Sequence, residues 1–403
     1  MKVAVLGYGT VGSGIVEVLE INKETIAKKA GKFLEIKYIL DRREFDEHPM
    51  KECFVKDINT ILEDGEVGII AEAMGGLNPA YDYVKAALEK GKSVVTSNKE
   101  LVAAHGPELL EIASKRQCNF LFEASVGGGI PVIRPLNTAL TGDEICEITG
   151  ILNGTTNFIL TKMREEKRAF EDVLKEAQDL GYAERNPEAD VEGHDTCRKI
   201  AILSSLAFGN HVDYKDIPTQ GITAISPEDM DDAEIMGYTL KLLGRCKKEE
   251  DKVFASVEPA MISKEHPLAM VNDVFNAILV KGNMVGDVMF YGQGAGKLPT
   301  ASAVVADIID AARHESIHIP IFWNREKIEL TDKEEVKAQY FIRLDGEVNY
   351  NKKIVTEIFG EVEEVSSCKG YVFITPYEEQ KVLNEKLEML KGCKVVSKIY
   401  IEK

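Results

Sequence analysis

The chain opens with a glycine-rich turn that directly follows a short apolar run. Residues 2–6 read Lys-Val-Ala-Val-Leu, and residues 7–12 read Gly-Tyr-Gly-Thr-Val-Gly before a helical stretch begins. This G-x-G-x-x-G spacing between a strand and a helix is typical of a dinucleotide-binding unit, because glycines allow a tight turn and a close backbone approach to a pyrophosphate at a helix N-terminus. The predicted cofactor-binding residues of this turn are Gly7, Gly9, Thr10, Val11 and Gly12.

Apolar runs and helical stretches alternate after this turn. The helical stretches cover residues 12–28, 79–90 and 108–115, and the apolar runs cover 33–40, 67–71, 93–96 and 119–122. Strands and helices that take turns in this way predict an α/β fold with a doubly wound parallel sheet of the Rossmann type. We expect this dinucleotide-binding domain to span residues 1–133.

A second pattern begins near residue 134. Longer helical stretches (169–180, 195–208 and 227–243) mix with apolar runs at 146–152 and 274–289. This favours an α+β catalytic and dimerisation domain over residues 134–326. The strongly apolar helix at 300–313 is expected to pack back onto the first domain, and residues 328–335 are charged and resemble a linker.

The last segment, residues 336–403, predicts a small separate domain. Strands are expected at 338–344, 362–366, 371–375 and 395–401, and helices at 352–359 and 378–390. This βαββαβ order is that of a ferredoxin-like fold, which is compact and can stand alone.

Composition excludes several classes of protein. A formal net charge of −18 disfavours nucleic acid and anionic membranes as partners, because both require a basic face. Seven scattered cysteines form no Cys-x-x-Cys pair, which favours reduced thiols over a zinc site or a disulfide framework. The sequence shows neither a signal peptide nor a membrane-length apolar stretch, so we expect a cytoplasmic protein.

The ends of further predicted strands add cofactor-site candidates. Asp41 follows the second strand and favours NAD, because a carboxylate accepts a hydrogen bond from a ribose hydroxyl. Arg42 and Arg43 come next and favour NADP, because arginines neutralise a 2′-phosphate. The choice between NAD and NADP is therefore open. Further candidates follow other strands, at the sheet edge where ligands bind: Gly75, Thr96, Ser97 and Lys99.

Charged residues gather between Tyr182 and Lys199. Asp195 and Lys199 are four residues apart and so share one helical face. One interpretation is an exposed ion pair on a solvated helix. However, residues 200–208 are almost entirely apolar, which indicates a buried helix, and charges at its mouth need partners or a polar cavity. Such a cavity suits an amino-acid substrate.

Taken together, the sequence resembles the homoserine dehydrogenase family over essentially its whole length. Besides the N-terminal glycine turn, the resemblance is carried by these segments: T-S-N-K at 96–99, F-E-A-S-V-G-G-G-I-P at 122–131, G-I-L-N-G-T-T-N-F-I-L at 150–160, G-Y-A-E at 181–184, D-V-E-G-H-D-T-C-R-K at 190–199 and G-A-G-K-L-P-T-A-S-A-V-V-A-D at 294–307. The order and spacing of these segments make the resemblance specific. It implies reversible reduction of L-aspartate 4-semialdehyde to L-homoserine with NADPH or NADH, in threonine and methionine biosynthesis.

The resemblance also implies roles for particular residues. Lys199 transfers a proton, and Asp195 and Lys99 lie beside the reacting oxygen. Glu184 and Asp190 are substrate carboxylates, and Gly296 lies near the cofactor. The remaining implied contacts are Gly154, Thr155 and Tyr182 on the substrate side, and a monovalent cation (Na⁺ or K⁺) held mainly by carbonyls of Glu123, Val126, Gly128 and Ile130.

The C-terminal segment resembles the ACT regulatory domain but departs from it in one loop. Residues 345–350 read Asp-Gly-Glu-Val-Asn-Tyr and lack the proline of the usual Asp-x-Pro-Gly turn. Binding of an amino-acid effector such as threonine and a purely structural or dimerising role are both open. The resemblance further implies a homodimer or homotetramer. The competing hypothesis is a catalytically silent NAD(P)-sensing protein, which would keep the glycine turn but lose the charged cluster.

Overall fold

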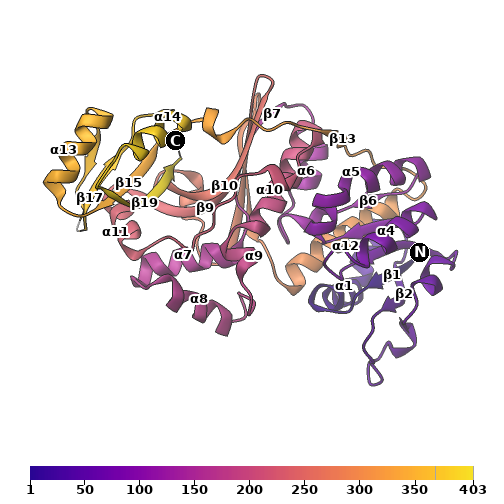
Figure 1. The fold of residues 1–403 in the computed structure, drawn as a ribbon. Helices are drawn as coiled ribbons and strands as arrows, with labels where there is room; N and C mark the ends of the chain where they lie inside the picture. Colours follow the sequence, from indigo (N-terminus) through magenta and orange to yellow (C-terminus); the bar gives the residue numbers. More distant parts are fainter. Residues whose placement is uncertain (368, 403) are drawn as a thin grey trace. The chain divides into compact units, whose positions relative to one another are not determined.

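The computed structural model describes residues 1–367 and 369–402, and the chain divides into two compact units (Figure 1). Unit 1 comprises Met1–Ile145, Ala201–Tyr214 and Lys281–Ile328. Unit 2 comprises Cys146–Ile200, Lys215–Val280 and Glu329–Lys403. None of the helices in the described part of the chain combines the length and apolar character that a membrane span requires.

A six-stranded parallel sheet forms the centre of unit 1, in the order β3-β2-β1-β4-β5-β6. Its strands are β1 (Lys2–Leu6), β2 (Glu35–Leu40), β3 (Phe54–Val55), β4 (Val67–Glu72), β5 (Ser93–Thr96) and β6 (Phe120–Leu121). The helices are α1 (Thr10–Ile21), α2 (Lys23–Ala30), α3 (Ile58–Leu62), α4 (Ala80–Glu89), α5 (Lys99–Arg116) and α6 (Ile133–Thr138). This topology confirms the predicted doubly wound sheet. Strand order reverses beside β1, where such sheets bind dinucleotides.

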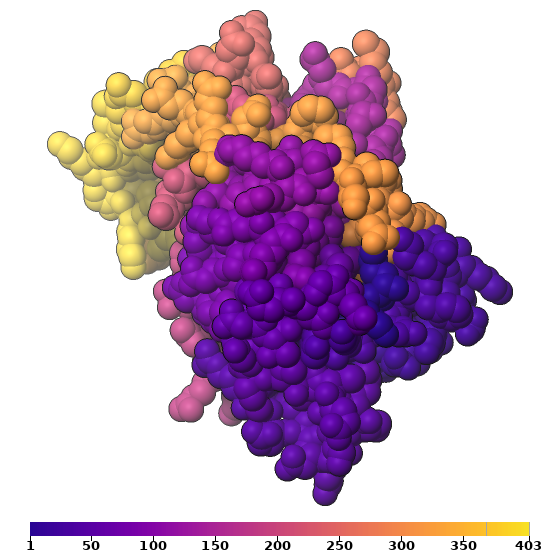
Figure 2. Space-filling view, turned by 90° about the vertical axis from the view of Figure 1, so that its right-hand side faces the viewer, coloured from indigo at the N-terminus to yellow at the C-terminus, as the bar shows by residue number. Residues whose placement is uncertain are grey.

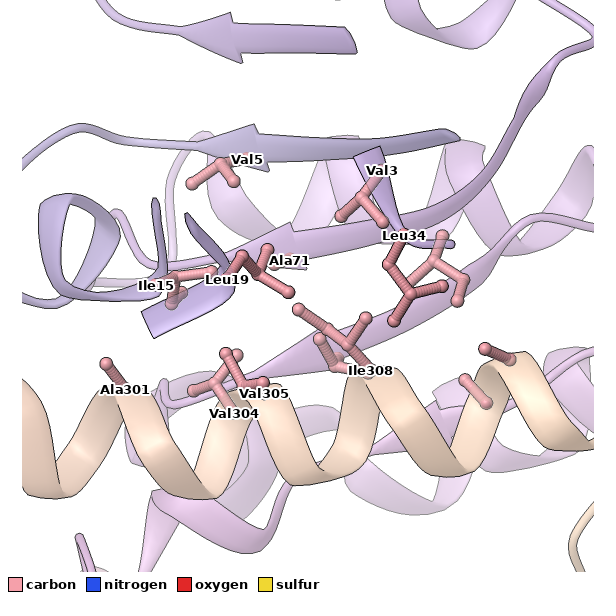
Figure 3. Close-up of a cluster of buried hydrophobic side chains, with 14 of the residues drawn as sticks. Val3, Val5, Ile15, Leu19, Leu34, Ala71, Ala301, Val304, Val305 and Ile308 are labelled. Atoms are coloured by element: carbon pink, nitrogen blue, oxygen red, sulfur yellow. The ribbon is translucent and has the colours of Figure 1, made fainter. Parts of the chain in front are cut away.

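Helix α12 (Lys297–Arg313) packs against this sheet although it is far away in the sequence. Its Val304 and Ile308 are fully buried in one apolar cluster with Val3 of β1 and Ile15 of α1 (Figure 3). A Cβ atom at Gly14 would lie 2.8 Å from the Lys297 carbonyl oxygen, so α1 and α12 approach each other too closely for a larger residue. The apolar pattern of the helix explains this position.

The segment after α12 continues over the surface of unit 1, and Figure 2 shows it in orange against the purple N-terminal part. The Asn119 side chain fixes it by donating to the His314 and Ile317 carbonyls, at 3.2 and 3.0 Å. Strand β13 (Asn324–Lys327) then pairs with β8 (Asn210–His211). Unit 1 also includes β12 (Gly286–Gln293).

Unit 2 is built on consecutive strands of a nine-stranded sheet, in the order β11-β7-β9-β10-β19-β15-β17-β16. Its strands are β7 (Ile145–Ile151), β9 (Tyr238–Glu249), β10 (Lys252–Ser263), β11 (Phe275–Gly282), β14 (Lys337–Ala338), β15 (Tyr340–Asp345), β16 (Glu363–Val365), β17 (Tyr371–Ile374), β18 (Glu378–Glu379) and β19 (Lys394–Ile401). The helices are α7 (Gly154–Glu166), α8 (Phe170–Asp179), α9 (Glu188–Val191), the first half of α10 (His194–Phe208), α11 (Pro227–Ile235), α13 (Val348–Phe359) and α14 (Gln380–Glu388).

The predicted helix at 227–243 is wrong in its second half. Helix α11 ends at Ile235, Gly237 adopts a left-handed conformation with φ of 78°, and β9 starts at Tyr238. Residues 239–246 are all buried, and periodicity alone does not distinguish a fully buried strand from a buried helix. Similarly, the single apolar run predicted at 274–289 is divided into two strands by a turn.

The C-terminal segment has the predicted βαββαβ order, but it is not a separate sheet. Its last strand, β19, pairs with β15 and also runs parallel to β10, with Ala260 opposite Tyr400 (Figure 1). The C-terminal strands therefore extend the sheet of the preceding domain. The expected division into domains 1–133, 134–326 and 336–403 remains a prediction.

Buried ion pairs join the C-terminal strands to the rest of unit 2. Arg343 of β15 contacts Asp229 of α11 at 2.8 Å. Arg245 of β9 contacts Glu258 at 2.8 Å and Glu402 at 2.9 Å. All five side chains are at least nine-tenths buried.

Candidate active site

A buried ion pair stands at the start of α10. The Lys199 ammonium lies 2.8 Å from Asp195 Oδ2 and donates to the Leu152 carbonyl at 2.7 Å. Lys199 is 8% exposed and Asp195 2% exposed, so the interpretation as an exposed surface pair is wrong. The apolar residues that follow Lys199 pack in the core, so the start of the helix and its ion pair are buried as well. Two charges out of contact with water require a polar surrounding.

Asn153 supplies part of that surrounding, and the sequence analysis missed its role. Its amide nitrogen donates to Asp190 at 2.7 Å and to Asp195 at 2.9 Å. Its side-chain oxygen caps α7 by accepting from the Thr156 amide at 2.9 Å. An asparagine just before a helical stretch is a recognisable N-cap signal, but that signal says nothing about the two carboxylates.

The predicted substrate-side residues lie at the start of α7 and in the turn after α8. Gly154 is the first residue of α7, and a Cβ atom there would lie 2.7 Å from the Val274 carbonyl oxygen, so only glycine fits. Thr155 donates to the Tyr182 carbonyl at 2.7 Å. The side chain of Glu184 is exposed, and among the described residues no hydrogen bond to its carboxylate is seen. The structure thus brings Asp190, Asp195 and Lys199 together but not Glu184.

In unit 1, the glycine turn has the geometry that a bound pyrophosphate requires. A Cβ atom at Gly12 would lie 1.8 Å from the Gly7 carbonyl oxygen, so the turn is closed by glycine alone. At Gly9, the N-cap of α1, a Cβ atom would meet nothing within 4 Å. No side chain caps this helix N-terminus among the described residues, so its amides can face an anion. These features fit a dinucleotide.

At the end of β2, Asp41 is already engaged by the protein. Its carboxylate accepts from the Tyr8 amide at 2.8 Å and from the Arg43 guanidinium at 2.9 and 3.0 Å. The Arg43 guanidinium holds the pKa of Asp41 well below its usual range. Arg43 is therefore the partner of Asp41, and the Arg42 carbonyl accepts from Lys56 at 3.1 Å. The predicted contact of Arg42 with the cofactor remains a prediction.

Another carboxylate, Glu72, lies at the end of β4, and the sequence analysis missed it. Glu72 is fully buried and accepts from Thr96 at 2.5 Å and from the Met74 amide at 2.7 Å. Burial raises the pKa of its carboxyl. It also accepts from the Gly75 amide, so it shapes the predicted loop. The signal in the sequence was an acidic residue that directly ends an apolar run.

Three other predicted residues of unit 1, Lys99, Gly296 and Ser97, lie at the ends of helices or strands. Lys99 begins α5 next to the capping residue Asn98, and Gly296 caps α12 with φ of 117°. Ser97 is half-buried just after β5.

The predicted cation loop is buried and glycine-rich. The Glu123 carboxylate accepts from the backbone amides of Val132, Ile133 and Arg134 at 2.6–2.8 Å, which commits it to the start of α6. A Cβ atom at Gly128 would lie 2.2 Å from the Gly294 carbonyl oxygen. Within the described residues, no group of three or more His, Cys, Asp or Glu side chains could hold a metal ion. A site built from the carbonyls of Glu123, Val126, Gly128 and Ile130 remains a prediction.

Comparisons with known proteins cover both units. The family model described as the NAD-binding domain of homoserine dehydrogenase matches residues 7–123, and the homoserine dehydrogenase model matches residues 131–309. The homoserine dehydrogenase of Bacillus subtilis is 37% identical over 421 residues, which cover 99% of this chain and 96% of the relative. That of Synechocystis is 44% identical and covers 77% of this chain and 73% of the relative.

Solved structures give the same result. The crystal structure of a homoserine dehydrogenase from Thiobacillus denitrificans matches with a TM-score of 0.91 and 35% identity, covering 100% of this chain and 98% of that one. A hyperthermophilic archaeal homoserine dehydrogenase in complex with NADPH matches with a TM-score of 0.67 and 28% identity, covering 80% of this chain and 99% of that one.

Proposed function

Because the chain belongs to the homoserine dehydrogenase family, we propose that it is an NAD(P)-dependent oxidoreductase that interconverts L-aspartate 4-semialdehyde and L-homoserine. Within this chain, the buried ion pair of Lys199 and Asp195 supports the proposal most directly. Asn153 donates hydrogen bonds to Asp195 and to the nearby Asp190. A silent cofactor sensor has no use for such a cluster, and nothing supports that alternative.

When bound, a nicotinamide cofactor would supply the hydride-transfer chemistry for the interconversion of aldehyde and alcohol. Lys199 donates a proton to the substrate oxygen in the reducing direction and removes it in the oxidising direction. Its ammonium also stabilises negative charge that develops on that oxygen. Asp195 keeps the ammonium in position, and Lys99 is a second cation assigned to the reacting oxygen.

The substrate's own charges are assigned to Asp190, which is linked to this pair through Asn153, and to Glu184, which the family resemblance alone adds. Asp190 and Glu184 are assigned to its ammonium group, because carboxylates form charge-assisted hydrogen bonds with such donors. Gly154, Thr155 and Tyr182 are assigned to the remaining substrate surface. A hydrogen bond from Thr155 to the Tyr182 carbonyl links the start of α7 to the turn at residue 182, so both segments would line the same side of the substrate site.

For the cofactor, we infer a preference for NADP over NAD. A ribose hydroxyl could bond to Asp41 only after displacing Arg43, whereas a 2′-phosphate attracts that exposed guanidinium. Gly7, Gly9, Thr10, Val11 and Gly12 are assigned to the pyrophosphate, and Gly75, Thr96, Ser97 and Gly296 to the rest of the cofactor. By family resemblance, a Na⁺ or K⁺ ion in the loop of Glu123 and a homodimer or homotetramer complete the proposal. For the C-terminal strands and helices, an amino-acid effector such as threonine and a purely structural or dimerising role remain alternative proposals, and a cytoplasmic location is proposed from the sequence.

The test is the absorbance of the nicotinamide band in purified protein with aspartate semialdehyde, run in parallel with NADPH and NADH and with or without threonine. We expect oxidation of both cofactors to be enzyme-dependent and faster with NADPH. Folded protein that binds cofactor but oxidises neither would reject the assigned reaction.

A further inference from the structure

A second buried lysine lies in unit 2, and the proposed reaction does not use it. Lys241 of β9 is 1% exposed. Its ammonium donates to Asn157 Oδ1 at 3.0 Å, to Asn272 Oδ1 at 3.2 Å and, at close range, to the Val271 carbonyl. All three acceptors are neutral oxygens, and burial lowers the pKa of this lysine to about 7.

Asn157 connects this ammonium to α7. While its oxygen accepts from Lys241, its amide nitrogen donates to the Val271 and Phe275 carbonyls, at 3.1 and 3.0 Å. A further bond runs from the Asp273 amide to the Thr161 hydroxyl of α7, at 3.1 Å. Residues 271–275 are thus held against α7 at both ends and in the middle.

This segment in turn limits the first turn of α7. The Val274 carbonyl oxygen stands where a side chain at Gly154 would begin, 2.7 Å from an added Cβ atom. Asn157 also lies one helical turn after Asn153, and its backbone amide donates to the backbone carbonyl of Asn153 at 3.2 Å. A shift of residues 271–275 would therefore move the glycine assigned to the substrate and the asparagine that holds Asp190 and Asp195.

We propose that Lys241 is a positioning residue that, through Asn157 and residues 271–275, fixes the first turn of α7 for substrate binding. The inference rests on the proposed function, because that function assigns Gly154 and Asn153 to the site. Removing the ammonium would leave buried oxygens without a donor, and a buried acceptor that loses its partner is costly. The segment would move to satisfy them.

The first test is Lys241→Met, which keeps a flexible apolar chain one atom shorter than that of lysine and removes the donors. We expect KM for homoserine to rise about tenfold, corresponding to one lost hydrogen-bonded positioning contact, while the dissociation constant of NADPH changes less than twofold. A matched control is Lys92→Met in unit 1. Lys92 is also buried and also donates to backbone carbonyls, those of Asp64 and Val67, but lies outside unit 2.

The second test uses pH and does not depend on the first variant being well folded. Charged groups near Lys241 are Arg164, which lowers its pKa, and Glu165 and Asp273, which raise it. The unfolded pKa of a lysine is about 10.4, so between about pH 7 and 10 the unfolded chain holds a proton that the folded protein lacks. This contribution of Lys241 to folding stability therefore grows as pH rises through that window.

Asn272→Asp keeps an oxygen at the position of Asn272 Oδ1, which accepts from both Lys241 and Arg164, and adds a negative charge. It should raise the pKa of Lys241, flatten the stability rise between pH 7 and 10, and leave KM within threefold of the parent. The readout is urea unfolding across that pH range beside homoserine KM.

An unchanged KM in folded Lys241→Met would overturn the inference, as would equal weakening of homoserine and NADPH binding, or a similar KM change in Lys92→Met. A pH slope unaltered by Asn272→Asp would also contradict it. Failure of the proposed function is distinct, because the parent enzyme itself would then show no turnover.

Discussion

Two segments that come late in the sequence are joined to earlier parts of the fold in opposite ways. Helix α12 joins the sheet of unit 1 through hydrocarbon, with Ala301, Val304 and Ile308 fully buried (Figure 3). The C-terminal strands of unit 2 are joined through the backbone pairing of β19 with β10, and their side chains add buried ion pairs, such as Arg343 with Asp229. The comparison shows that an apolar contact surface can be recognised from the sequence pattern of one helix. A buried ion pair can be recognised only once the structure has placed both partners.

The two joints should also respond differently to mutation. Apolar burial is non-directional and scales with the buried area, so the loss of any one buried group weakens the joint. A buried ion pair contributes little net stability as a pair, but removing one partner leaves an uncompensated charge. Single and paired substitutions therefore separate the two cases.

The largest effect is expected for Arg343→Met, which leaves Asp229 buried without its cation. We expect it to lower the free energy of unfolding by about 3–5 kcal/mol, measured by urea unfolding. Adding Asp229→Asn removes the stranded charge but keeps an acceptor for the Ser226 amide at the start of α11. The double variant should regain most of the loss, and a double variant as unstable as the single one would break the comparison.

Ile308→Ala tests the apolar joint. We expect it to lower the free energy of unfolding by about 2–5 kcal/mol, because it removes a fully buried side chain and leaves a cavity between α12 and β1. Ser302→Ala, on the exposed face of the same helix, is the control and should stay within about 0.5 kcal/mol of the parent. Equal effects of the two changes would show that α12 is not docked through this stripe.

Asn153→Ala extends the comparison to the buried polar centre of unit 2. We expect kcat/KM to fall about a hundredfold. Without Asn153, the carboxylates of Asp190 and Asp195 would shift, and the ammonium of Lys199, the proton-transfer group, would shift with them. Asn153→Ser retains an oxygen that can cap α7, but its single hydroxyl proton and shorter side chain cannot replace the two donations to Asp190 and Asp195. The serine variant should lose similar activity with less loss of stability; full activity with serine would assign Asn153 to capping alone.

The smallest effect is expected at the exposed charges of unit 1. Arg43→Ala should reduce the preference for NADPH over NADH about tenfold, because the 2′-phosphate loses a cation and Asp41 becomes accessible to a ribose hydroxyl. The measurement is the dissociation constant of each reduced cofactor by fluorescence, with Arg116→Ala at the end of α5 as control. An unchanged ratio would remove Arg43 from cofactor selection.

The sequence predicts those parts of the fold and site that depend on local pattern. The glycine turn, the parallel sheet and the αβ order of the C-terminal segment all follow from spacing, and four-residue periodicity correctly pairs Asp195 with Lys199. The roles of Asn153, Glu72 and Lys241 do not follow, because their partners come from elsewhere in the chain. Asn153, for example, meets carboxylates 37 and 42 residues away. Lys241 was further hidden by a buried strand that reads as a helix.

The most direct test of the account concerns Lys199, the cation at the centre of the buried cluster. Lys199→Ala and its neighbour Arg198→Ala are compared for NADPH dissociation constant and for kcat with aspartate semialdehyde. The account predicts that Lys199→Ala binds NADPH like the parent but loses at least about a thousandfold in kcat, consistent with loss of acid–base catalysis and of charge stabilisation, while Arg198→Ala remains active. Near-parental turnover in Lys199→Ala would contradict it.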